Sequence, residues 1–412
     1  MRALYDSHMH LLTLGHPSFL SFLETLRQRG FEQLWSQITS PGYLIGTIIF
    51  KGGEATRNLL SVVENDVASI LELMEDDLAG AFRKPGDPEP LFRDGRILLG
   101  GREYDRLVLE PMLMDFQAAH AGSKDLYYSR PPAKPMVAQV DDILEGIREY
   151  RRRRPEGLLV VRPFLGIHPQ HYDKESLRAL LIRAFRGFNR SASGHRDAWR
   201  ASRRYSGNPE RPTRGAFAGV KVYPPLGFDP WPDDEEELEK TKILYGFCSE
   251  NRIPLASHCD DQGYRTIPLE DSFRFTSPAR WRPALEAFPG LEVCFAHFGQ
   301  QYIRGPGAPP AGAWTDEIVD LILERSGVWT DFSFDGAESA YYVELKSRLD
   351  GLDKISRERV ERAVLFGTDF PLSLMKTRSY SDYWRTFLES PLSERRKRMF
   401  AEENGERFLF GT

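Results

Sequence analysis

The sequence has little cysteine, only three in 412 residues, and none of them stand in Cys-x-x-Cys spacing. This excludes a disulfide scaffold and a zinc ribbon, and it indicates a reducing compartment. No apolar run approaches the roughly 18 residues that cross a bilayer. The net charge of −5 argues against a protein that binds nucleic acid or a membrane surface through an overall positive charge. Because the first residues, MRALYDSHMHLL, lack the apolar core of a signal peptide, we expect a cytoplasmic protein.

Several common catalytic motifs are also missing. The sequence contains no Gly-x-Ser-x-Gly, no His-Glu-x-x-His and no Gly-x-Gly-x-x-Gly. These absences exclude the serine nucleophile elbow, the helical zinc-protease site and the dinucleotide-binding fingerprint.

Short apolar runs alternate along the chain with stretches of helical character. Such alternation is typical of parallel strands joined by crossover helices. The predicted strands are Arg2–His8, Leu107–Met114, Leu158–Ile167, Ala216–Val222, Ile253–His258, Leu291–His297, Val328–Ser333 and Ala363–Thr368. Eight strand–helix units in a chain of this length predict an α/β fold of the (β/α)8 TIM-barrel type. On pattern alone, a doubly wound open sheet is the alternative.

Two segments are longer than one strand–helix unit requires. The first lies after strand one, at about residues 51–105. Within it, Glu54–Phe82 predicts a long helix and Pro90–Gly101 a hairpin that turns at Asp94-Gly95. We interpret this segment as an insertion that caps one mouth of the barrel, and residues 1–412 as a single barrel domain.

The second insertion, residues 183–214 between strands three and four, is rich in arginine and poor in acidic residues. An acidic run, residues 233–237, follows soon after it. One interpretation is a solvated surface on which the two segments partly neutralise each other. The other is a basic rim that attracts an anionic substrate or partner.

Polar side chains close several of the predicted strands. His8 and His10 are two residues apart at the end of the first strand, so they point to the same face. Two imidazoles placed in this way form half of a transition-metal site. Later strands end in or near Lys221, His258, His297 and Asp369. Barrel enzymes carry their active groups at these strand ends, so we predict a metal site there rather than unrelated structural side chains.

This order of residues resembles the amidohydrolase superfamily of metal-dependent (β/α)8 barrels, with His-x-His, Lys, His, His and Asp on strands one, four, five, six and eight. The segment FGTDFP around Asp369 resembles the Gly-Ser-Asp-Trp-Pro pattern of the amidohydrolase-2 branch. Residues 403–411 are similar to the family's C-terminal Asn-Ala-x-Arg-Leu-Phe-Gly helix. The resemblance spans nearly the whole chain, apart from the two insertions. The branch contains hydrolases, lactonases, decarboxylases and hydratases.

The resemblance implies a set of metal ligands. His8, His10 and Asp369 correspond to ligands of the more buried ion. His258 and His297 correspond to ligands of a second ion; alternatively, His258 joins the first site and His297 contacts substrate.

Lys221 matches the lysine that carbon dioxide converts to a bridging carbamate in binuclear members of the superfamily. The alternative is an unmodified lysine that contacts substrate in a one-metal enzyme. The resemblance therefore implies one or two divalent ions. We expect zinc, with manganese, iron or nickel as alternatives for ligands of this kind.

The main functional hypothesis is a metal-dependent hydrolase that cleaves an amide, lactone or related carboxyl-derived bond. A bound ion lowers the pKa of water from about 15.7 to about 7, and Asp369 is expected to accept the proton, with His297 as a second catalytic group. Activity should fall as the pH drops through the histidine range, because ligand imidazoles must be neutral.

The alternatives keep the same scaffold. The first is a non-oxidative decarboxylase or hydratase with one metal ion. A phosphoesterase is a further alternative, although TatD-like nucleases of this barrel class carry Glu rather than Lys on strand four. The last is a catalytically inactive binding barrel, which an intact ligand set argues against.

Other residues near the strand ends are candidates for substrate binding. His168 and His171 follow strand three, and Tyr223 lies two residues after Lys221. Asp115 and Arg162 are additional candidates. We expect a small-molecule substrate, either neutral or anionic. We expect no membrane or nucleic-acid partner, and assembly as a homodimer.

Overall fold

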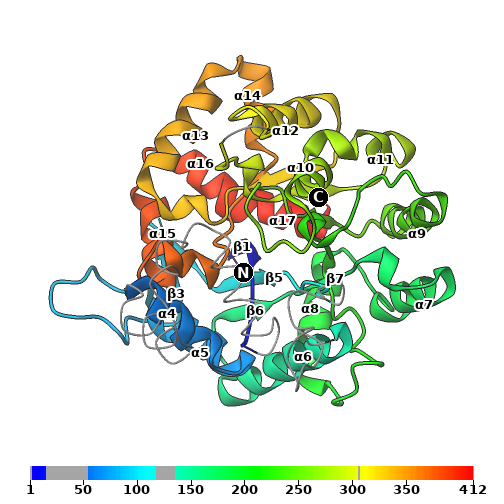
Figure 1. The fold of residues 1–412 in the computed structure, drawn as a ribbon. Helices are drawn as coiled ribbons and strands as arrows, with labels where there is room; N and C mark the ends of the chain where they lie inside the picture. The colour runs from blue at the N-terminus through cyan, green and yellow to red at the C-terminus, as the bar shows by residue number, and fades with distance from the viewer. Residues whose placement is uncertain (1, 15–53, 100, 117–134, 305–306, 412) are drawn as a thin grey trace, which may run out of the picture.

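A computed structural model describes residues 2–14, 54–99, 101–116, 135–304 and 307–411. Parallel strands form the centre of the fold, and helices surround them (Figure 1). The central strands are β1 (Ala3–Met9), β5 (Arg106–Pro111), β6 (Leu159–Val161), β7 (Phe164–Gly166), β8 (Gly219–Val222), β9 (Leu255–Ser257), β10 (Val293–Phe295), β11 (Val328–Asp331) and β12 (Val364–Leu365). They pair in parallel in two arcs, β1-β5-β6 and β7-β8-β9-β10-β11-β12.

Backbone hydrogen bonds join β12 to β1. The amide of Ser7 donates to the carbonyl of Phe366 at 2.9 Å, and the amide of Thr368 donates to the carbonyl of His8 at 3.0 Å. The first and last strands of the chain are therefore neighbours, which closes one junction between the two arcs.

The other junction lies between β6 and β7, which are consecutive pieces of the predicted strand Leu158–Ile167. This prediction of one continuous strand was wrong, since Pro163 separates the two pieces and has no N–H to donate to a ladder. A parallel bridge between Met112 and Phe164 connects β7 to the end of β5. The strands thus complete the ring of a TIM barrel, as predicted.

Helices fill the connections between the strands and cover the outside of the ring (Figure 1). They are α6 (Met136–Arg153), α7 (Lys174–Ala184), α9 (Glu235–Asn251), α10 (Leu269–Thr276), α11 (Arg282–Ala287), α12 (Ala313–Glu324), α13 (Ser339–Gly351), α14 (Lys354–Glu361), α15 (Tyr380–Glu389) and α16 (Glu394–Arg398). Their buried apolar side chains pack against the strands; in α6, for example, Val140, Ile143, Leu144 and Ile147 are each at most 5% exposed.

The last helix, α17 (Asn404–Phe410), closes the end of the barrel at which the strands begin. Its side chains Phe408 and Leu409 are fully buried in a cluster with Tyr5 and other residues that point into the barrel. The ring of Phe408 stacks on that of Phe164, with centroids 6.0 Å apart. This plug leaves the opposite end, where the strands finish, as the open mouth.

The described part of the first insertion contains two helices rather than the single helix predicted for Glu54–Phe82. These are α4 (Glu54–Val63) and α5 (Val67–Leu78). Asp66 separates them because its carboxylate caps the start of α5, where it accepts from the amide of Ser69 at 2.7 Å. The predicted hairpin forms from β2 (Phe92–Arg93) and β3 (Arg96–Leu99), and β4 (Arg102–Tyr104) extends it.

Only part of this insertion lies at the mouth. Helix α4 packs against the turn Leu372–Met375, which follows β12. The hairpin instead leads to the start of the barrel strands, where Asp105 and Arg2 exchange hydrogen bonds next to β1. The insertion therefore runs from one end of the barrel to the other.

The arginine-rich insertion lies at the plugged end and not at the mouth. It contains α8 (Ala192–Ala201), and Arg190 forms two hydrogen bonds to Glu292, just before β10, and a third to the carbonyl of Phe408. Of the acidic run, Asp233 pairs with Arg274 and Arg280 and Glu236 with Lys240. The arginine-rich insertion therefore does not form a basic rim at the mouth. Among the described ion pairs, none joins it to the acidic run.

We predict that Asn404→Ala destabilises the protein by about 1–3 kcal/mol, because Asn404 is fully buried and donates to the carbonyls of Glu361 and Val364 at 2.8 and 2.5 Å. The substitution leaves both carbonyls without this donor at the plugged end. Urea unfolding followed by circular dichroism measures the change.

Glu406→Ala on the same helix is the matched control, since Glu406 is exposed. We expect its effect to stay within about 0.5 kcal/mol. Equal stability of the two variants would contradict the importance of the Asn404 contacts.

Candidate metal centre and cavity

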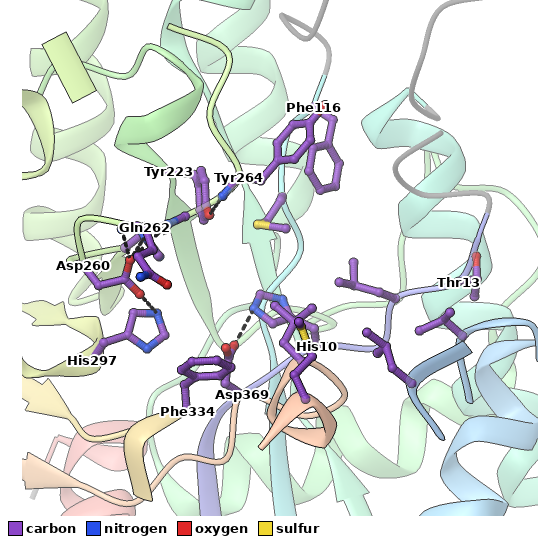
Figure 2. A pocket seen from close by; sticks show the side chains of 18 of the residues that line it. His10, Thr13, Phe116, Tyr223, Asp260, Gln262, Tyr264, His297, Phe334 and Asp369 are labelled. Carbon is purple, nitrogen blue, oxygen red and sulfur yellow. Dashed lines mark hydrogen bonds and ion pairs between the residues drawn. The ribbon is translucent and has the colours of Figure 1, made fainter. Parts of the chain in front are cut away.

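A cavity opens at the end of the barrel where the strands finish (Figure 2). Its polar lining includes His10, His258, His297 and Asp369, which come from four different strand ends. Figure 2 shows Phe116 and Tyr264 across the cavity from Phe334 and Asp369. The structure therefore gathers predicted site residues that are far apart in the sequence around one space.

The first group of potential metal ligands consists of His8, His10 and Asp369, all buried. His10 Nε2 lies 3.2 Å and His8 Nε2 3.9 Å from Asp369 Oδ1. The Nδ1 atom of His10 is 2.8 Å from the carbonyl oxygen of Met112. With Nδ1 donating to that carbonyl, Nε2 of His10 keeps its lone pair toward Asp369, as a metal ligand requires.

Asp331 has the same effect on His8. Its Oδ2 atom is 2.9 Å from His8 Nδ1, so Nε2 of His8 also faces Asp369. The other carboxylate oxygen of Asp331 accepts from the amide of His297 at 3.1 Å and from the hydroxyl of Ser333 at 2.5 Å. Two imidazoles and a carboxylate with their donor atoms directed at one point are a donor set that suits a divalent transition-metal ion.

The protonation states agree with this arrangement. Burial lowers the pKa of His8 to about 3, with further lowering by Lys221 and His297, although Asp331 opposes the change. Burial raises the pKa of Asp331, but contact and hydrogen bonding with His8, followed by His297 and Ser333, outweigh burial and lower it overall. His8 is therefore neutral and Asp331 ionised at neutral pH, as a carboxylate–histidine–metal arrangement requires.

Lys221 lies in β8 and is 1% exposed. Its Nζ atom has no hydrogen-bond partner among the described residues. Burial lowers the pKa of Lys221, and Asp331 and Asp369 oppose this effect. An unpartnered buried amine of this kind costs free energy unless it meets a ligand, a substrate or a modification.

A second group of potential ligands consists of His258, Asp260 and His297. Asp260 Oδ1 lies 3.2 Å from His258 Nε2, and Asp260 Oδ2 lies 3.7 Å from His297 Nε2. Asp260 Oδ1 also accepts from the amides of Gln262 and Gly263 at 2.7 and 3.0 Å, which holds the carboxylate in place. In this structure Asp260 therefore already contacts both imidazoles.

Both ring nitrogens of His297 face oxygen atoms. Nδ1 is 2.9 Å from the hydroxyl oxygen of Ser333, and Nε2 faces Asp260. Burial lowers the pKa of His297, but Asp260, Asp369 and Asp331 outweigh burial and raise it overall. The surroundings of His297 thus favour the protonated imidazole, with Nδ1 at hydrogen-bond distance from Ser333 and Nε2 facing Asp260.

The backbone is strained at several of these positions. His297, Phe334 and Asp369 have positive φ angles of 60°, 69° and 57°. Such conformations cost about 1–3 kcal/mol for bulky residues and persist where surrounding contacts enforce them, often at functional sites. Here they follow the ends of β10, β11 and β12 and turn the side chains into the cavity (Figure 2).

Of the predicted substrate-binding residues, only Tyr223 lines the cavity. Its ring lies 4.5 Å from that of His258, and its hydroxyl accepts from the amide of Tyr264 at 2.8 Å. His168 and His171 are not among the described lining residues. Their rings stack 4.2 Å apart, and Asp115 Oδ1 lies 3.2 Å from His171 Nδ1. Contact of this pair with substrate stays a prediction.

Arg162 lies away from the mouth, where it donates to the carbonyl of Gly215 before β8 at 3.0 Å. This position is inconsistent with its candidacy for substrate binding. The sequence reasoning also missed Asp260, Asp331 and Ser333. Asp331 ends β11, so the rule that selected the other strand ends could have found it, and Asp260 follows His258 by two residues.

The fold and this group of side chains define a TIM-barrel protein with a candidate metal centre at the open mouth. A family model described as amidohydrolase (Amidohydro_2) matches residues 141–411, more than half of the chain. The chain belongs to this amidohydrolase family, and it is an enzyme of the amidohydrolase superfamily, as the sequence analysis predicted.

Several solved structures are similar over nearly the whole chain. A 5-carboxyvanillate decarboxylase from Novosphingobium aromaticivorans, in complex with manganese, is 13% identical with a TM-score of 0.46, and the match covers 99% of this chain and 96% of that one. A dihydroxybenzoic acid decarboxylase from Polaromonas sp., also with manganese, has 11% identity, a TM-score of 0.43 and coverages of 99% and 96%. A 4-oxalomesaconate hydratase from Rhodopseudomonas palustris has 13% identity, a TM-score of 0.44 and coverages of 98% and 95%.

The search of curated protein sequences found no match to this chain. In the part of the chain that the structure describes, no helix is both long and apolar enough to cross a membrane.

We predict that Asp331→Asn weakens the affinity for Mn²⁺ by about 10- to 100-fold, because the amide no longer holds the His8 tautomer. Isothermal titration of the metal-free protein with Mn²⁺ measures the change. Asp320→Asn, which alters an exposed carboxylate on α12, is the control and should bind as the unmodified protein does. Unchanged affinity in Asp331→Asn would contradict a role for Asp331 in orienting His8.

Proposed function

We propose that the protein is a metal-dependent decarboxylase that releases carbon dioxide without oxidation from a small carboxylic acid. The observation that supports this most directly is the environment of His297, whose two ring nitrogens face the hydroxyl of Ser333 and the carboxylate of Asp260. Such an imidazole is suited to donate a proton. A metal ligand instead needs a nitrogen lone pair that is free.

The group formed by His8, His10 and Asp369 supports a site for one metal ion. Asp331 and the carbonyl of Met112 hold Nδ1 of His8 and His10, so both Nε2 atoms face Asp369. This proposal revises the main hypothesis from the sequence, a hydrolase, in favour of its alternative. The ion is proposed to be Mn²⁺ or Zn²⁺, both of which accept imidazole and carboxylate ligands.

The chemistry requires a carboxylate to be held and a carbon atom to be protonated. When bound, the ion supplies a Lewis acid that holds and polarises the substrate. The bond to the carboxyl carbon breaks, and its electron pair stays on the substrate carbon. His297 gives the proton on Nε2 to that carbon, which forms the new C–H bond and leaves the imidazole neutral, while Ser333 orients the ring through Nδ1.

A hydrolase with two ions is the second candidate, and Lys221 favours it. Its amine is buried without a hydrogen-bond partner among the described residues, and burial lowers its pKa. A neutral amine is the form that reacts with carbon dioxide to give a carbamate, which would bridge two ions between the groups around Asp369 and Asp260.

The role of His297 separates the two candidates. In the decarboxylase, we expect His297→Asn to lower kcat for carbon dioxide release by about 100- to 10,000-fold while the metal content stays the same. Carbon dioxide release from a panel of aromatic and aliphatic carboxylic acids, together with metal analysis by mass spectrometry, measures both quantities.

His195→Asn is the matched control, because it removes an equally buried imidazole at the plugged end, beside Phe410. It should keep kcat. Loss of metal in His297→Asn, or an absence of carbon dioxide release from the whole panel with hydrolysis of amides or lactones instead, would contradict the decarboxylase.

The role of Lys221 gives an independent prediction. With one ion, Lys221→Ala should still bind one Mn²⁺ per chain, whereas a carbamate-bridged pair should fall from two ions to one or none. Metal analysis of both proteins, prepared without chelators and in the presence of bicarbonate, measures the ratio. Two ions in the unmodified protein would contradict the proposed single-metal site.

A further inference from the structure

The cavity has a polar side and an apolar side. The metal-ligand groups and Asp260 form the polar side. The apolar side, here called the apolar wall, consists of Leu14, Leu59, Val63, Met114, Leu372 and Met375. No lysine or arginine is present among the described residues that line the cavity. The two sides therefore offer different chemistry to a bound molecule.

The insertion supplies part of the apolar wall. Leu59 and Val63 belong to α4 and are 2% and 8% exposed. The amide of Leu14 donates to the carbonyl of Val63 at 2.8 Å, and the side chain of Asn58 donates to the carbonyl of Arg378 at 3.0 Å. Helix α4 is thus tied both to the segment after β1 and to the region after β12, and it lines the cavity with Leu59 and Val63.

Aromatic side chains continue the apolar surface on either side of the ligand groups. Phe116 packs edge-on against Tyr264, with ring centroids 5.7 Å apart, and Phe334 lies next to Asp369 (Figure 2). Phe334 adopts its positive φ angle while its side chain lines the cavity. The apolar surface therefore begins immediately beside the predicted metal ligands.

The charged side chain next to the lining residue Met375 has partners of its own. Lys376 follows Met375, but its ammonium lies 2.9 Å from both Asp335 Oδ1 and Glu338 Oε1 and sits 4.5 Å from the ring centroid of Phe334. A charged substrate group placed against the apolar wall would lose its hydration and gain no opposite charge from the described lining, which is unfavourable.

We infer that the substrate joins a metal-binding carboxylate to an uncharged, apolar group that packs against the apolar wall, and that Leu59 and Val63 of α4 select that group. This inference rests on the proposed metal site and adds the substrate class to it. The described apolar wall offers no opposite charge to an acid with a second charge remote from the reacting carboxylate. We therefore expect the negative charge of an anionic substrate only on the carboxylate that binds the metal ion.

Hydroxamates test the inference without knowledge of the substrate, since their head group binds metal ions. Mn²⁺-loaded protein is titrated with acetohydroxamate, octanohydroxamate and suberate monohydroxamate. The last two have chains of equal length and differ in a terminal carboxylate. We expect octanohydroxamate to bind at least about 10-fold more tightly than acetohydroxamate. Suberate monohydroxamate should bind about 10-fold less tightly than octanohydroxamate.

Equal affinity of octanohydroxamate and suberate monohydroxamate would overturn the inference and leave the metal site intact. Failure of all three, acetohydroxamate included, would overturn the metal site and the inference with it.

Variants on α4 locate the selective surface. Leu59→Glu should weaken octanohydroxamate binding about 10-fold and leave acetohydroxamate binding unchanged, which also reports that the fold and metal are retained. Ser61→Glu on the exposed side of the same helix is the matched control and should bind all three as the unmodified protein does. If Leu59→Glu does not fold, Leu59→Ala replaces it with a smaller expected loss. Unchanged octanohydroxamate affinity in a folded Leu59 variant would overturn the role of α4.

Discussion

The carboxylate of Asp331 is the interaction on which the arrangement of the site depends. It lies at the end of β11, where one oxygen contacts His8 Nδ1 and the other accepts from the amide of His297 and the hydroxyl of Ser333. A buried imidazole with one nitrogen held in this way has its other nitrogen directed by the ring geometry alone. Asp331 therefore orients His8 and positions His297 although it does not line the cavity.

The closure of the barrel supplies the second constraint. Asp369 reaches the two N-terminal histidines because the amides of Thr368 and Asp369 both donate to the carbonyl of His8, at 3.0 and 2.8 Å. Asp6 strengthens the same junction, since its carboxylate accepts from Thr368 and from the hydroxyl of Tyr380. The spacing between these groups is thus set by backbone pairing, which is more rigid than side-chain contacts across a loop.

The sequence predicted those features of the fold and site that depend on residues close together in the chain. Alternating apolar runs predicted the barrel, and the polar residues that close those runs predicted His8, His10, His258, His297 and Asp369, which the structure brings together. The rule failed where a single residue interrupts a pattern, as Pro163 does between β6 and β7 and Asp66 between α4 and α5.

Long-range placement was beyond the reach of the sequence pattern. Nothing in the composition of residues 183–214 distinguishes the open end of a barrel from the plugged end, and contacts such as that of Arg190 with Glu292 decide the matter. In the same way, the apolar residues of α4 have the spacing of any amphipathic helix, and only tertiary packing shows that Leu59 and Val63 face a cavity.

The junction between β1 and β12 has a consequence for the order of folding. The hydrogen bonds between Asp6 and Thr368 join residues that are 362 positions apart, so they form only after the strands between them have been synthesised. Until then, β1 and β12 each present an unpaired edge, which is a surface prone to association with other chains. The junction between β1 and β12 therefore has two roles. It brings Asp369 to the two N-terminal histidines, and it covers two strand edges that would otherwise favour aggregation.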